Sequence, residues 1–257
     1  MNAYTEMDTV QFSTALERRM VEQLRTQKFC FASGAALRDS RFFAESSWVR
    51  FSECWARLTL DRHMADHGTY RFRRYGAYEL EHPSADLVRL PHAPYEQPKY
   101  INPLNGGVSR SFDPLEDEFW ESPLLRGLLR SLARVFWAVL GSSAPWNIRL
   151  HPYRIVAGSG TPGKPTPEGL HRDGVDFIVT LMVKRQNVQG GQTVITDQRG
   201  DVLMSRALLE PLDIVVADDA ATMHSVTAIG RDDAESDAFR DVLVVAYTAI
   251  ADTSASR

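Results

Sequence analysis

The segment GLHRDG (residues 169–174) places a histidine and an aspartate two positions apart. Residues i and i+2 of an extended chain point to the same side, so His171 and Asp173 can offer an imidazole nitrogen and a carboxylate oxygen to one metal ion. His224, at the start of a later strand-like segment, is the best candidate for a third ligand. Two histidines and one carboxylate on one face of an octahedron leave the opposite face open, which is the arrangement used for non-haem Fe(II) oxygen chemistry.

This His-x-Asp spacing is weakly specific when it stands alone. A chain with seven histidines and 33 acidic residues contains such a pair by chance fairly often. The pair is then also compatible with a surface ion pair or a hydrogen-bonded core histidine. A β-barrel context, with a further histidine on a later strand, makes the metal interpretation much stronger. Other barrels of this class bind metals through several histidines and a glutamate, so iron is inferred from the ligand types.

Arg240 is a candidate for binding the distal carboxylate of a dicarboxylic cosubstrate. It lies at the start of the most apolar strand-like segment of the chain. 2-Oxoglutarate chelates iron through its keto-acid end and leaves a distal carboxylate that needs a cation. A guanidinium pairs with a carboxylate bidentately and keeps its charge. Val242, Val244 and Ala246 share its side of the strand, so burying it there without an anion would be costly. The alternative is an arginine at the strand's edge that reaches water or pairs with Asp241.

The second half of the chain is rich in short strand-like segments that would carry these residues. Gly, Pro and Asp clusters separate them, and no helix-length pattern intervenes, so we expect antiparallel pairing in a barrel or jelly roll. A Gly/Pro-rich loop, residues 159–169, leads directly into His171. The expected strands are 148–157, 175–183, 192–196, 213–217, 224–229 and 241–250.

The first half is expected to support this core with helices. Apolar residues recur near helical spacing over residues 9–27 and 40–59. Pro123 and Gly141 bracket a third apolar stretch, as a helix start and stop would. We therefore expect one domain over residues 1–257, mainly β with N-terminal helices. Its parts are helix-rich support (1–67 and 115–141), outer strands and loops (68–114), and a β-helix core (148–250).

Composition excludes several classes of partner. The formal net charge is −4 and the basic residues are scattered, so we expect no nucleic-acid partner, which would need clustered cations. The N-terminus lacks an apolar signal core, and no apolar run approaches a membrane span. Cys30 and Cys54 are the only cysteines and form no metal or redox motif, which favours a reducing compartment. A cytoplasmic protein without membrane contact is expected, and nothing specifies its oligomeric state.

Several blocks between about residues 68 and 250 resemble one known family. They are YRFRRYGAY (70–78), GGVSRSF (106–112), FWESPLL (119–125), LHPYRIVA (150–157), LHRD (170–173), the glycine pair 190–191, HSVTAIG (224–230) and AFRDVLVVAYT (238–248). With these blocks the sequence resembles the bacterial Fe(II)/2-oxoglutarate-dependent dioxygenases that hydroxylate free amino acids, of the L-isoleucine 4-hydroxylase type. Residues 1–67 and the loop around residues 161–167 match poorly.

The resemblance implies a double-stranded β-helix (jelly-roll, cupin-like) core with iron on His171, Asp173 and His224. It also implies Arg240 on the distal carboxylate of 2-oxoglutarate, with O₂ as the further cosubstrate. The expected reaction is hydroxylation of a free, aliphatic L-amino acid at an unactivated carbon, with release of succinate and CO₂. The presence of Asp173 favours hydroxylation, because related halogenases lack this carboxylate so that chloride can bind.

A free amino acid would need a cation for its carboxylate and an acceptor for its ammonium group. Arginines on the strand-like segments are candidates for the cation, and neighbouring aromatic residues are candidates for the pocket wall, although each also has a structural interpretation. These candidates are Arg71, Arg73, Arg110, Arg154, His151, Tyr153 and Tyr75.

Two other functions stay open at this point. One is a dioxygenase that acts on a peptide or protein side chain or another small metabolite, which predicts an open, charged groove. The other is a non-enzymatic jelly-roll metal- or ligand-binding protein, which leaves Arg240 without a reason.

Overall fold

The computed structural model describes residues 11–40, 43–97, 107–233 and 236–251. The helices are α1 (Thr14–Gln27), α2 (Gly34–Arg38), α3 (Glu45–Glu53), the 3₁₀ helix η2 (Cys54–Arg57), α4 (Asp117–Trp120) and α5 (Pro123–Leu140). The strands are β1 (Phe29–Ala32), β2 (Thr59–Leu60), β3 (Arg71–Arg73), β4 (Gly76–Leu80), β5 (Val88–Arg89), β6 (Trp146–Val156), β7 (Phe177–Gln186), β8 (Val188–Gly190), β9 (Gln192–Asp197), β10 (Val202–Ala207), β11 (Ile214–Asp218), β12 (Thr222–Val226), β13 (Ile229–Arg231) and β14 (Phe239–Ala249).

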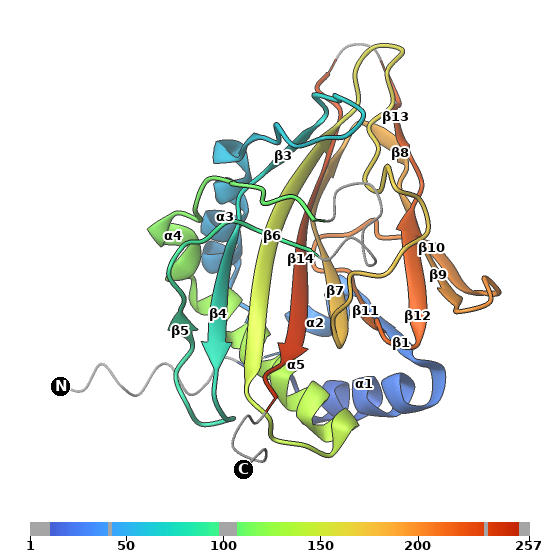
Figure 1. Cartoon of the computed structure of the whole chain (residues 1–257). Helices are drawn as coiled ribbons and strands as arrows, with labels where there is room; N and C mark the ends of the chain where they lie inside the picture. The colour runs from blue at the N-terminus through green and yellow to red at the C-terminus, as the bar shows by residue number, and fades with distance from the viewer. Residues whose placement is uncertain (1–10, 41–42, 98–106, 234–235, 252–257) are drawn as a thin grey trace.

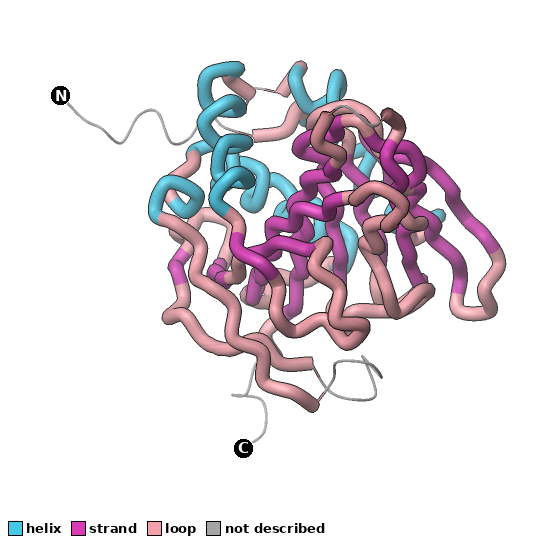
Figure 2. The backbone as a smooth tube through the Cα atoms, turned by 90° about the horizontal axis from the view of Figure 1, so that it is seen from above, coloured by secondary structure: helices cyan, strands magenta, loops and turns pink. Residues whose placement is uncertain are grey.

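The strands form two layers, and helices cover the outer side of the larger one (Figures 1 and 2). The larger layer is a nine-stranded sheet in the order β1-β11-β7-β14-β6-β3-β2, with β4 pairing with β6 and β5. The smaller layer holds the sheets β10-β9-β12 and β13-β8. All of these strand pairs are antiparallel, as predicted. This is the mainly β, jelly-roll architecture expected from the sequence.

The two faces of the long strands β7 and β14 are both apolar, because each packs against a different layer. Leu181 and Leu243 belong to the large core shared with the helices. Their neighbours Met182 and Val242 point the other way and pack with Ile195 of β9 between the layers. Strands buried on both faces read as continuous apolar runs, which is how these two appear in the sequence.

Helix α5 is bounded by its sequence. The Ser122 side chain accepts a hydrogen bond from the backbone N–H of Leu125 at 3.3 Å, which caps the first turn. Pro123 occupies the first turn, and Gly141 ends the helix in the left-handed conformation with φ of 64°. The helix therefore begins and ends where the sequence predicted, and its buried leucines pack on the outer face of the larger sheet.

Other helices and strands begin or end at different residues than predicted, because side chains cap them or the regular structure is interrupted. The predicted helix 9–27 begins at Thr14, because Ser13 caps it; residues 9 and 10 lie outside the described residues. The predicted helix 40–59 is α3 followed by η2, and residues 41 and 42 are likewise not described. The single strand expected over 224–229 is divided into β12 and β13. Residue 106 in the GGVSRSF block also falls outside the described part.

Both cysteines are free and buried. Within the described ranges, no helix is long and apolar enough to cross a membrane.

Candidate metal centre

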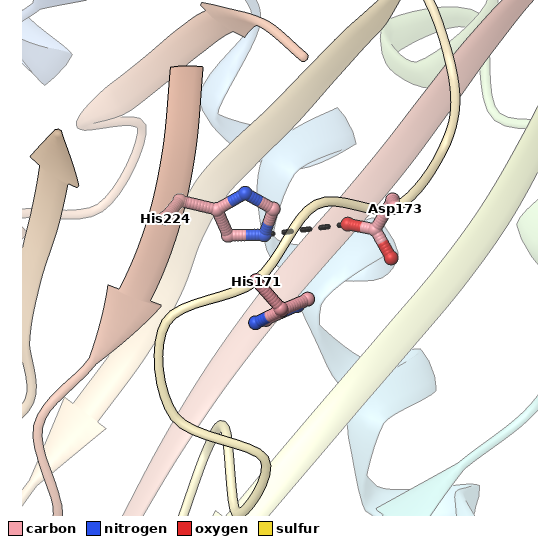
Figure 3. A group of neighbouring side chains, drawn as sticks. All are labelled: His171, Asp173 and His224. Atoms are coloured by element: carbon pink, nitrogen blue, oxygen red, sulfur yellow. Dashed lines mark ion pairs between the residues drawn. The ribbon is translucent and has the colours of Figure 1, made fainter. Parts of the chain in front are cut away.

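Three side chains from two distant segments converge between the two layers. His171 and Asp173 lie in the loop before β7, and His224 lies on β12 (Figure 3). One potential ligand atom from each residue lies within 4.8 Å of the other two. The Nε2 atom of His224 is 3.3 Å from Oδ2 of Asp173. The arrangement is two imidazoles and one carboxylate directed at one point, which suits a divalent metal with open coordination positions.

The backbone sets the separation of the two histidines. The N–H of His171 donates to the carbonyl of His224 at 3.0 Å, and the N–H of His224 donates back at 2.9 Å. This isolated antiparallel bridge places the two rings side by side, with centroids 4.4 Å apart. Nδ1 of His171 donates to the carbonyl of Gly169 at 2.9 Å, so Nε2 is left to face a metal.

Asp219, which sequence reasoning missed, holds the loop that carries Asp173. Its buried carboxylate accepts three backbone N–H groups, from Asp173 at 3.0 Å, Gly174 at 2.7 Å and Val175 at 3.0 Å. The carboxylate also lies 3.9 Å from Nδ1 of His224. An acidic residue after the apolar strand β11 and shortly before His224 was the only signal in the sequence that could have identified it.

The side chains of Asp173, Asp219 and His224 shift one another's pKa values. Burial alone would raise the pKa of Asp173, but the hydrogen bond and charge of His224 outweigh it and hold that pKa well below its usual range. Burial would lower the pKa of His224, but Asp173 raises it instead. Burial and the charge of Asp173 raise the pKa of Asp219. The site thus carries concentrated negative charge that a divalent cation would neutralise.

A cavity lies against the three ligands, and we call it the central cavity. Its walls come from β3, β6, β7, β12, β14 and the loop before His171. The lining residues are Arg71, Tyr153, Ile155, Pro165, Thr166, Glu168, His171, Asp173, Thr180, His224, Val226, Arg240, Val242 and Val244. A larger groove lies between α1 and α5, but none of the predicted site residues lines it. The central cavity therefore combines the candidate ligands with charged side chains of both signs.

Arg240 lines the central cavity, and no carboxylate of the described residues pairs with it. It is 1% exposed, and its Nε and Nη2 atoms have no hydrogen-bond partner among the described residues. Burial, and then the charge of Arg185, lower the pKa of Arg240 to about 9. Because arginine keeps its proton in proteins, this shift expresses the cost of holding the charge without a counterion. Nε and Nη2 share one edge of the guanidinium, where a single carboxylate can accept from both.

The predicted substrate residues separate into three groups. Arg71 and Tyr153 line the central cavity. His151, Arg73, Arg110 and Tyr75 are buried beside it in a cluster of cations and aromatic rings, but they do not line it. In this cluster His151 stacks on Tyr75 with centroids 5.0 Å apart, and the guanidinium of Arg73 lies 3.7 Å from the Phe112 ring.

The prediction that Arg154 lines the pocket needs correction. Its Nε and Nη2 donate to both oxygens of Asp241, at 2.8 and 2.7 Å, on the outer side of the sheet. Along β6, Tyr153 faces the central cavity and Arg154, one residue later, points to the opposite face. Asp241, the alternative partner of Arg240 in the sequence, is therefore paired with Arg154. Arg240 remains available to bind another anion.

Several known proteins resemble this chain in sequence or in fold. A family model described as 2OG-Fe dioxygenase matches residues 52–246. L-isoleucine-4-hydroxylase of Bacillus thuringiensis is 27% identical over 185 residues, which are 71% of this chain and 76% of that protein. 3(1)-hydroxy-L-isoleucine 4-dioxygenase of Pantoea ananatis (strain AJ13355) is 25% identical over 158 residues, 60% of this chain and 63% of that protein. The crystal structure of a bsmA homolog from Methylobium petroleophilum PM1 matches with a TM-score of 0.82 and 33% identity, covering 91% of this chain and 93% of that one. These matches confirm the predicted fold class.

Proposed function

Because the chain belongs to the 2OG-Fe dioxygenase family, we propose that it hydroxylates a free, aliphatic L-amino acid at an unactivated carbon. Fe(II), 2-oxoglutarate and O₂ are the cofactor and cosubstrates of this enzyme class. Family membership makes the chain an enzyme, so the non-enzymatic alternative is set aside. The substrate class is supported by the two relatives whose names specify isoleucine or hydroxyisoleucine as substrate.

His171, Asp173 and His224 would hold the iron. Bound Fe(II), with 2-oxoglutarate and O₂, supplies the oxidising chemistry that hydroxylates a carbon while the keto acid becomes succinate and CO₂. The protein keeps the donor atoms in place through the histidine backbone bridge and the three hydrogen bonds to Asp219. Three protein ligands leave the remaining coordination positions for small molecules.

Arg240 is the observation on which the proposal chiefly depends. A buried guanidinium whose Nε and Nη2 have no acceptor among the residues that the structure describes fits the distal carboxylate of a dicarboxylic acid. It lines the same cavity as the candidate iron ligands, so a short diacid could reach both. Val242 and Val244 share its strand face and line the cavity beside it, so they would exclude water from the bound pair and strengthen the attraction.

Arg71 and Tyr153 would bind the substrate at another part of the cavity wall. Nε of Arg71 donates to Asp61 at 2.8 Å, so the buried Asp61 carboxylate fixes the arginine's orientation. The guanidinium remains in the cavity wall and supplies positive charge for a substrate carboxylate. Fixing two charged ends of a small molecule orients the carbon between them, and such positioning is a large part of catalysis.

Succinate production tests the proposal. The Fe(II)-loaded protein is incubated with 2-oxoglutarate, O₂ and each free L-amino acid, and the hydroxylated product is identified by mass spectrometry. We expect one or a few aliphatic amino acids to stimulate succinate release with matching product, and their N-acetylated, C-amidated forms to be inactive. Stimulation by capped peptides alone would favour the alternative substrate class. His171→Ala should abolish turnover and metal binding while leaving the circular dichroism spectrum unchanged.

A further inference from the structure

Glu168 is a carboxylate in the central cavity whose role the iron site does not explain. It precedes His171 by three residues in the Gly/Pro-rich loop and contributes to the cavity wall. Its Oε2 atom is fully buried and has no hydrogen-bond partner in the described part of the chain. A buried carboxylate oxygen without a donor is unfavourable, so the cavity has an acceptor that awaits a positively charged or hydrogen-bonding group.

Neither holding the metal nor orienting its ligands accounts for this glutamate. Among the described residues, the set of mutually close donor atoms comprises His171, Asp173 and His224, without Glu168. Oε1 of Glu168 lies 3.5 Å from Nε2 of His171, beyond good hydrogen-bond range. The ring of His171 is already oriented through its Nδ1 bond to Gly169. Glu168 is therefore a carboxylate additional to the metal set.

A group of opposite charge lines the same cavity. Arg71 uses Nε and Nη2 on one oxygen of Asp61, at 2.8 Å each, which leaves Nη1 without a hydrogen bond among the residues described. Burial alone would lower the pKa of Arg71, but negative charges that include Asp61 and Glu168 raise it. Arg71 and Glu168 thus lie close enough to influence each other electrostatically, and no hydrogen bond joins them.

The geometry points to Glu168 as the residue that binds the ammonium group of the substrate, with Arg71 binding its carboxylate. This inference rests on the proposed function and explains how the enzyme would select amino acids over carboxylic acids that lack the amino group. A zwitterion satisfies both groups, because its cation reaches the free oxygen of Glu168 and its anion reaches the free nitrogen of Arg71. An acid without the amino group would leave the glutamate unsatisfied, so the site should discriminate strongly against it.

Binding to Glu168→Gln measures this role without turnover. Gln has the same shape but no charge. The Fe(II)- and 2-oxoglutarate-loaded protein is kept anaerobic, and calorimetry gives the dissociation constants of the best amino-acid substrate and of its des-amino carboxylic acid. L-Isoleucine and 3-methylpentanoic acid are the first pair to use. Glu210→Gln, which removes the charge of an exposed loop carboxylate that does not line the cavity, is the control.

We expect Glu168→Gln to weaken amino-acid binding by roughly 10-fold or more, the effect of losing one charged hydrogen bond. The dissociation constants of the des-amino acid, of 2-oxoglutarate and of the metal should change by no more than about twofold, which is much less than the loss of one charged hydrogen bond. Glu168→Asp keeps the charge with a shorter reach and should fall between wild type and Gln. Glu210→Gln should match wild type throughout.

Three outcomes would overturn the inference. One is unchanged amino-acid binding in Glu168→Gln, and another is an equal loss for both probes. The third is a loss of metal, which would place Glu168 in the metal site. If wild-type protein bound no free amino acid at all, the proposed function itself would fail, and that result is distinct from the other three.

Discussion

Replacing Arg240 with methionine should weaken 2-oxoglutarate binding and at the same time stabilise the ligand-free protein. The two effects have one cause, a buried cation with two donors that no described residue accepts from. Methionine has a comparable length and no charge, so it fills the space without the burial penalty. Replacing a buried ion pair by apolar groups of similar volume is often neutral or stabilising by about 1–4 kcal/mol, and Arg240 has no partner charge among the described residues to lose. At the lower end, the ligand-free melting temperature should rise by about 2–4 °C.

The loss of affinity follows from the two donors on one edge of the guanidinium. Each hydrogen bond to a charged group contributes roughly 1.5–3 kcal/mol. Two such bonds at the lower value correspond to about 3 kcal/mol, or roughly a 100-fold rise in the dissociation constant of 2-oxoglutarate. Thermal stabilisation by 2-oxoglutarate should shrink accordingly, because ligand stabilisation depends on concentration relative to that constant.

Calorimetry on the Mn(II)-loaded protein measures the affinity, and thermal unfolding of the apo protein measures the stability. The matched control is Arg154→Met with Asp241→Asn, which removes an arginine–carboxylate pair from the outer face of the same sheet. It should leave 2-oxoglutarate affinity unchanged. Two charged hydrogen bonds to 2-oxoglutarate cannot be lost for less than about a fivefold fall in affinity. A smaller fall for Arg240→Met would therefore refute the role of this arginine in binding 2-oxoglutarate.

Three further predictions concern the surroundings of the site. Asp219→Asn replaces an acceptor of three backbone N–H groups by a side chain with only one oxygen, so metal affinity measured by competition with a chelator should fall roughly 10-fold or more; unchanged affinity would mean that the loop holds its shape alone. Gly191→Ala introduces a Cβ 2.9 Å from Cγ2 of Ile229, 3.0 Å from Nη1 of Arg185 and 3.3 Å from Cδ of Arg240 at a φ of 70°, so it should displace Arg240 and weaken 2-oxoglutarate binding. Gly141→Ala has similar backbone strain but no neighbour within 4 Å, so it should leave that binding unchanged. Burial raises the pKa of the Cys30 thiol to about 12 and that of Cys54 to about 11, so at pH 8 both should resist a thiol reagent until urea unfolds the chain; fast labelling of the native protein would contradict their burial.

Local periodicity explains which parts of the fold were predictable. Strands β7 and β14 are apolar on both faces, and helix α5 carries its own cap and stop, so short-range patterns were sufficient for them. Strand β10 was not predicted, because its side chains are largely exposed and show no apolar alternation. Strand β1 is four residues long and owes its extended form to pairing with β11, which is a tertiary contact.

The same distinction applies to the site. The two-residue spacing of His171 and Asp173 was enough to predict that they face one point. Asp219 and Glu168 were not predicted, because both are acidic residues in loops whose burial depends on distant segments. The side-chain parity of β6 separates Tyr153 from Arg154, but only the register against β14 shows which of the two faces points inward.

The main-chain bridge between His171 and His224 has a practical consequence for protein engineering. Reciprocal amide bonds, rather than the shape of the surrounding side chains, determine how far apart the two imidazoles stand. Tyr153 and Val226 can therefore be randomised together in a variant library, since neither contributes to that bridge. Such a library would change the shape of the cavity around the hydrocarbon part of the substrate while the metal ligands keep their positions. Variants with new substrate specificities could then be selected without redesigning the metal site.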